Sequence, residues 1–192
     1  MNNNQKTITQ EKNDPFSSYT VGSLVIIAIL FLSLFFGWSY IFNTSSGVEI
    51  GINGWNYVCL SFTWYFKTTN EVVFGNVASF YYYVKYLVIT LTVLTAIVFY
   101  LLVALAPIAF INVKKSNVEL TTVNAILSLI VAAILLACFI VSLCMGPKMI
   151  KGYCSNNPKC SVCSLAILPM FVAISNAILN FVLRSKMLEN AE

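Results

Sequence analysis

The residues of this chain that could do chemistry are its cysteines, three of which lie close together at Cys154, Cys160 and Cys163. The chain has no His, and its only Asp is Asp14, in a polar N-terminal stretch. A zinc site at the three cysteines would need Cys59 or a carboxylate as its fourth ligand. A redox CxxC usually accompanies a βαβ pattern, which the sequence does not show. Disulfide bonding is the favoured interpretation, because disulfides persist in oxidising compartments. The four cysteines would form two bonds, and one of them would join Cys59 to the segment that holds the other three.

Three asparagines lie within otherwise apolar segments, at Asn124, Asn176 and Asn180. Asn176 and Asn180 are four residues apart, so they share one face of a helix. If the two segments are antiparallel, Asn124 lies at a similar depth. These amides could hydrogen-bond between helices, or they could line a path for a transported solute. We favour interhelical contacts, because a transport path usually adds an ionisable residue and these segments have none.

The composition places the chain in a membrane. Hydrophobic residues make up 59% of it, charged residues 9%, and the mean hydropathy is +0.83. About 20 apolar residues cross ~30 Å of hydrocarbon as a helix. The sequence has four such segments without Lys, Arg, Asp or Glu, at about 21–42, 86–111, 120–145 and 163–183. We therefore expect an all-α membrane protein, a bundle of four transmembrane helices that occupies residues 21–184.

The remaining segments are two tails and two outer loops. Residues 1–20 are polar and are expected to form a disordered cytosolic tail, and residues 185–192 a short cytosolic one. The outer loops are residues 43–85 and 146–162. Basic residues divide almost evenly between the two sides, so the positive-inside rule does not decide the orientation. The cysteines do, because disulfides persist on the outer or luminal side. Both termini are then cytosolic, in the plasma membrane or an endomembrane.

The first outer loop shows the alternation of a strand. Val48, Ile50 and Ile52 alternate with Glu49 and Gly51. Further extended stretches follow in the same loop, separated by turn residues. The pattern predicts a small antiparallel β-sheet in the first outer loop.

One further motif lies at the start of this loop. Asn43-Thr44-Ser45 fits the N-glycosylation acceptor pattern, immediately beside the first span.

The layout resembles that of the claudin and peripheral-myelin-protein superfamily. Trp38, near the end of the first span, could match the Trp found there in that family. Gly54-Trp55-Asn56-Tyr57-Val58-Cys59 loosely matches the Gly-Leu-Trp and first Cys of its first outer loop. Thr68 and Thr69 stand where a second loop Cys would fall. The resemblance implies a four-helix bundle topped by a small sheet, which acts through lateral and facing contacts rather than catalysis.

These observations favour a non-enzymatic membrane protein that organises partners, as an adhesion, scaffolding or auxiliary subunit. The alternative is a small oligomeric transporter or channel. A membrane enzyme is the least supported class, because the spans lack clustered His, Asp or Glu. No cofactor or metal is expected, and the longest basic run, Lys114-Lys115, is too short to suggest nucleic-acid binding. Besides the bilayer, we expect lateral homo- or hetero-oligomers, which Ala132, Ala133 and Ala137 would allow to pack closely.

The disulfide interpretation predicts that Cys59, Cys154, Cys160 and Cys163 resist alkylation until a reductant is added. Mass spectrometry of peptides labelled before and after reduction measures this. Its result also restricts the pairing, since four cysteines allow three connectivities. Labelling of Cys160 and Cys163 without reductant would contradict the disulfides and reopen the zinc and redox interpretations.

Overall fold

The computed structural model describes residues 16–35, 37–43, 48–55, 58, 78–153, 160–163 and 166–190. The strands and the helix segments 78–88 and 145–153 are described by their backbone. The elements in chain order are α1 (Ser17–Ser33), β1 (Gly37–Asn43), β2 (Val48–Asn53), α4 (Ala78–Lys114), α5 (Val118–Tyr153), β3 (Cys160–Cys163) and α6 (Ile167–Glu189).

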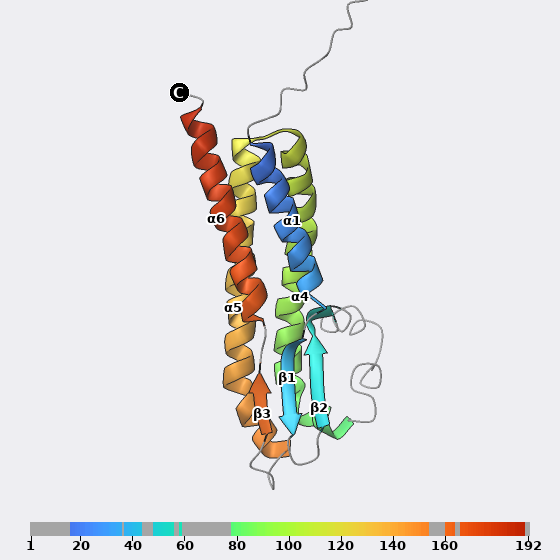
Figure 1. Ribbon diagram of the computed structural model, residues 1–192. Coiled ribbons are helices and arrows are strands. Elements are labelled where there is room, and N and C mark those ends of the chain that lie inside the picture. The colour runs from blue at the N-terminus through green and yellow to red at the C-terminus, as the bar shows by residue number, and fades with distance from the viewer. Residues whose placement is uncertain are drawn as a thin grey trace, which may run out of the picture.

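The four helices form a bundle in which consecutive helices run in opposite directions (Figure 1). Contacts join α1 to α4, α4 to α5, α5 to α6, and α6 back to α1, so the bundle is a closed ring of four. The start of α1, the turn between α4 and α5, and the end of α6 lie together at one end, which we call the terminal end. The strands lie at the opposite end, the sheet end, beside the far halves of α4 and α5.

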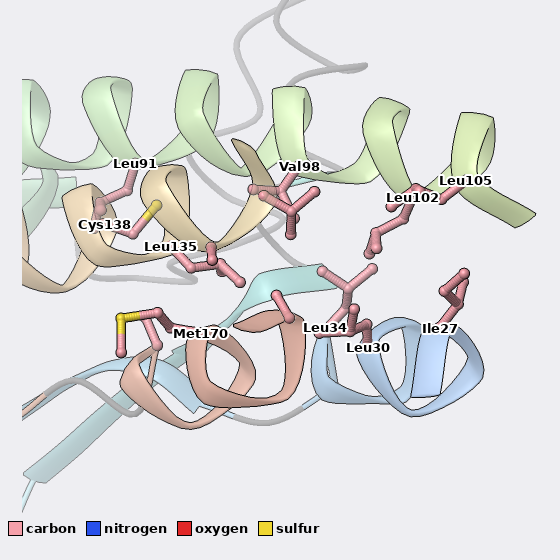
Figure 2. Close-up of a cluster of buried hydrophobic side chains, with 14 of the residues drawn as sticks. Ile27, Leu30, Leu34, Leu91, Val98, Leu102, Leu105, Leu135, Cys138 and Met170 are labelled. Atoms are coloured by element: carbon pink, nitrogen blue, oxygen red, sulfur yellow. The ribbon is translucent and has the colours of Figure 1, made fainter. Parts of the chain in front are cut away.

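An apolar core joins the helices between these two ends. Ile27 and Leu30 of α1 face Leu102 of α4, while Leu135 of α5 and Met170 of α6 complete the cluster (Figure 2). All of these side chains are buried. The outward faces are apolar too, as in a protein solvated by lipid tails. Exposed large hydrophobic residues recur along the helices, for example Val25, Val103, Ile126 and Phe171.

Three helical segments are long and apolar enough to cross a membrane: Ile89–Lys114, Val118–Cys144 and Ile167–Glu189. The chain is therefore a membrane protein. The predicted bundle of four spans is wrong, because α1 has only 17 residues. At about 1.5 Å per residue it covers roughly 26 Å, less than the ~30 Å of a hydrocarbon core. From Gly37 the chain continues as strand β1, although we predicted a span as far as residue 42.

Hydropathy alone could not predict that the chain changes from helix to strand at Gly37. Gly37 to Asn43 is an apolar run rich in aromatic residues, and such a run suits a buried strand as well as a membrane helix. The strand forms because partners are present on both of its sides.

The three strands form one antiparallel sheet in the order β2-β1-β3. Ile41 of β1 pairs with Ile50 of β2 and with Val162 of β3. The prediction of a sheet within the first outer loop is therefore wrong. Its central strand comes from the predicted first span, and its third strand comes from the second loop. The elements whose side chains the structure describes are all helical.

The helices also differ from the predicted spans at their ends. Helix α4 begins at Ala78 and so includes residues 78–85 of the predicted first loop. Helix α5 continues past residue 145 to Tyr153. Helix α6 runs from Ile167 into the predicted tail, to Glu189, and α1 begins at Ser17, within the predicted N-terminal tail. Helices α4 and α5 thus extend well beyond α1 and α6, and α5 contacts strand β3 of the sheet.

A hydrogen-bonded turn joins α4 to α5. Asn117 precedes α5, and its Oδ1 accepts the backbone N–H groups of Glu119 at 2.7 Å and Leu120 at 3.4 Å. The Asn117 N–H donates to Asn112 Oδ1 at 3.0 Å, and Asn112 Nδ2 donates to Thr121 Oγ1 at 2.9 Å. Asn117 is therefore an N-cap that satisfies the first donors of α5.

Replacing Asn117 by Ala should lower the unfolding free energy by about 1 kcal/mol, because those donors lose their acceptor. Asn117→Asp keeps a capping oxygen and should restore most of the loss. Unfolding in a titration of denaturing detergent measures both variants. Equal stability of the Ala and Asp variants would contradict the cap.

Candidate functional site

The most polar place inside the bundle is a group of five side chains, which we call the amide cluster. It consists of Ser23 on α1, Asn124 and Ser128 on α5, and Asn176 and Asn180 on α6. All five are at most 1% exposed. Each pair on α5 and α6 is four residues apart, so each helix presents two polar groups on one face.

Asn176 is the centre of the cluster. Its Nδ2 donates to Asn124 Oδ1 at 3.2 Å and to Ser128 Oγ at 2.8 Å, which uses both amide hydrogens. Its Oδ1 accepts the hydroxyl of Ser23 at 2.8 Å. Ser128 Oγ in turn donates to the backbone carbonyl of Asn124 at 2.8 Å. One side chain therefore binds α6 to both α5 and α1.

Ser23 closes the cluster from the α1 side. Its Oγ accepts Asn124 Nδ2 at 3.1 Å and Asn180 Nδ2 at 3.0 Å, while its own hydrogen goes to Asn176. Asn124 and Ser23 lie on helices at opposite corners of the ring, so this bond crosses the bundle core. Asn180 Nδ2 also donates to the backbone carbonyl of Asn176 at 2.8 Å. Within the part of the chain that the structure describes, Asn180 Oδ1 is the one amide oxygen of the cluster without a partner.

Small residues let these helices approach closely enough to bond. Ala125 and Ala177 are buried and directly follow Asn124 and Asn176, and Ala173 is buried about one turn before Asn176. A methyl group at Gly22 would lie 3.5 Å from Leu179 Cδ2, so α1 passes close to α6 beside Ser23.

The cluster is electrically neutral. Every buried polar residue in the described ranges is Ser, Thr or Asn. Within the same ranges, no three His, Cys, Asp or Glu residues lie where they could hold a metal ion. Neutral amides and hydroxyls bonded to one another offer neither a nucleophile activated by a base nor a proton donor near neutral pH. The arrangement can hold helices in register, and it has no evident catalytic chemistry.

The structure places the other candidate residues apart from this cluster. Cys59 and Cys154 lie outside the described residues. Cys160 and Cys163 are the first and last residues of β3, and their side chains lie outside the described part as well. Asn43, the glycosylation candidate, is the last residue of β1. Of the span cysteines, Cys138 is a buried free thiol and Cys144 an exposed one.

Sequence reasoning named the three asparagines and missed the two serines. A signal for Ser128 was present, because it follows Asn124 by four residues as Asn180 follows Asn176. No comparable spacing marked Ser23, which stands among apolar residues of α1.

A second contact fastens the first loop to the bundle through Trp55. Its backbone N–H donates to the carbonyl of Leu34 at 2.7 Å, just after α1 ends. Its ring stacks on Phe35, with centroids 5.7 Å apart, and meets Phe99 of α4 edge to face at 6.1 Å. This group of three aromatic rings lies close to the point where α1 ends and the chain continues into the sheet.

Comparison with known proteins adds no relative: no family model, no curated protein and no solved structure matches this chain.

The hydrogen bonds rank the cluster residues by their effect on stability. Asn176→Ala should lower the unfolding free energy by about 2 kcal/mol, because Ser23, Asn124 and Ser128 all lose a partner inside the bundle. Asn180→Ala should cost about 1 kcal/mol, because the substitution also removes the unpartnered Oδ1. Unfolding midpoints in a mild detergent measure the difference.

Ser175→Ala is the matched control. Ser175 is adjacent to Asn176 but exposed, and its hydroxyl donates only to the carbonyl of Phe171 in its own helix. Its replacement should shift stability by no more than a few tenths of a kcal/mol. An effect of Asn180→Ala as large as that of Asn176→Ala would show that Asn176 is not the centre of the cluster.

Proposed function

We propose that this chain is a non-enzymatic multi-pass membrane protein that organises partners in the plane of the bilayer, as an adhesion, scaffolding or auxiliary subunit. The observation that carries the proposal is the closure of the amide cluster. Each amide nitrogen and hydroxyl of the cluster donates to an acceptor within the cluster itself, and within the described residues Asn180 Oδ1 is the one oxygen left over. Because the donors of the cluster are used between the helices, we infer that function rests on the outward surfaces of the bundle.

The same geometry argues against a path for solutes through one chain. Toward the sheet end, the amide cluster gives way to an apolar layer that includes Leu30, Leu102 and Leu135. These side chains point into the space between the helices, as Figure 2 shows, and they are buried. A hydrated path would have to displace both the layer and the cluster.

Lateral assembly uses the outward face of a helix, and α5 offers a suitable one. Of the three alanines that the sequence suggested for close packing, Ala132 is buried in the bundle, Ala137 is half-buried and Ala133 is exposed. Ala133 lies between the exposed side chains of Ile130 and Leu136. A second copy or a partner helix could approach α5 most closely at this alanine.

The orientation belongs to the same proposal. The terminal end would face the cytosol and the sheet end the outer or luminal side, in the plasma membrane or an endomembrane. Membership in the claudin and peripheral-myelin-protein superfamily would add contacts that the sheet end makes with a facing membrane.

After mild extraction with thiols alkylated beforehand, the native protein should migrate well above the 21.3 kDa of one chain, with one recurrent component. Ala133→Leu should shift it toward the monomer, about tenfold for each 1.4 kcal/mol of packing lost. The matched control is Ala104→Leu, at an exposed alanine of α4. Crosslinking followed by mass spectrometry identifies the component.

Two outcomes would contradict the proposal. One is a lone monomer from native membranes under conditions that keep other complexes intact. The other is solute flux into vesicles above empty controls, abolished by Leu102→Trp in the apolar layer, which would establish the transporter.

A further inference from the structure

The terminal end carries four exposed basic side chains. Lys114 and Lys115 follow one another where α4 ends, and Arg184 and Lys186 lie in the last turns of α6. Helices α4 and α6 occupy opposite corners of the ring, so positive charge flanks this end on two sides. In the described ranges at this end, the four cations outnumber the two carboxylates, Glu119 and Glu189.

Aromatic rings hold two of these ammonium groups at a defined level. Lys114 Nζ lies over the ring of Phe110, 4.7 Å from its centroid. Lys186 Nζ lies 4.6 Å from the ring centroid of Tyr19 and donates to its hydroxyl, which joins the ends of α6 and α1. Both lysines thus bend along the helix surface toward a partner, and among the described residues no carboxylate pairs with either of them.

The cations border directly on the lipid-facing surface. Phe110 and Ile111 are exposed one turn before Lys114, and Phe181 and Val182 are exposed just before Arg184. Side chains with such neighbours keep their stems along apolar surface and their charges at the level of the lipid headgroups.

We propose that the terminal end binds the anionic phospholipids of its leaflet, through Lys114 and Lys115 at one corner and Arg184 and Lys186 at the other. The partner is a lipid whose headgroup carries net negative charge, because the site offers several cations at interface depth and no cavity is needed. Binding of this kind is electrostatic, so it weakens as salt is added. It does not depend on whether the protein organises partners.

The test measures which lipids the full chain retains. Protein purified in a neutral detergent is mixed with equimolar phosphatidylglycerol and phosphatidylcholine, and retained lipids are counted by native mass spectrometry. The wild-type protein should prefer phosphatidylglycerol, at most by about five-fold for each cation engaged. Raising the salt to about 0.5 M should reduce the preference.

Two variants locate the binding site, and a third variant serves as the control. Lys114→Gln with Lys115→Gln should remove part of the preference and leaves the Lys186–Tyr19 contact intact. Adding Arg184→Gln and Lys186→Gln should remove most of the rest. Lys148→Gln with Lys151→Gln, at the sheet end of α5, should leave it unchanged, because both residues lie at the opposite end of the bundle from the terminal end.

Three results would overturn the proposal. The first is equal retention of the two lipids by the wild-type protein. The second is an equal loss in the sheet-end control. The third is displacement of the lipid by free glycerol phosphate at the same concentration, which would assign the cations to a soluble phosphate. The unfolding midpoint of each variant separates a lost site from a misfolded chain.

Discussion

A polar group buried among lipid-solvated helices has no water to bond, so it must find its partner inside the protein. The rest of this structure depends on how that requirement is met at Asn176. Its amide binds Asn124 and Ser128 of α5 and accepts the hydroxyl of Ser23 from α1. These directional bonds fix the height and rotation of three helices relative to one another, which apolar contacts alone do less strictly. The faces that remain outside are then determined, and they are apolar.

The same requirement acts on the backbone at the sheet end. A strand exposes unpaired N–H and C=O groups unless a neighbour lies on each side, and in hydrocarbon such groups are costly. β1 pairs with β2 along its length, apart from an irregularity between Gly37 and Ser39, and it pairs with β3 from Tyr40 to Asn43, so its second half has a partner on both sides. The long helix α5 lies beside the sheet and contacts β3. Trp55 fastens the loop at the point where helix changes to strand.

The two ends of the molecule therefore differ in kind. The terminal end is a plain helical bundle with cations at its rim, suited to contact with lipid headgroups. The sheet end presents strands that lie beyond the ends of α1 and α6. Between them lies a neutral interior in which the side chains of the amide cluster bind one another. Function in such a protein rests on its surfaces, which is why lateral assembly and lipid contact are the properties we infer.

The sequence by itself determined that the chain lies in a membrane, because charge-free apolar segments of this length are typical of membrane-spanning helices. It also determined the shared face of Asn176 and Asn180, because helical spacing is a local property. Only the tertiary structure decided that residues 37–43 form a strand, since an apolar run is compatible with helix or strand until its neighbours are present. The sequence likewise did not predict that α5 continues beyond residue 145, because hydropathy falls there while the helix continues beside β3. Ser23 joined the amide cluster for the same reason: its partners are 101 or more residues away in sequence, and packing alone brings them together.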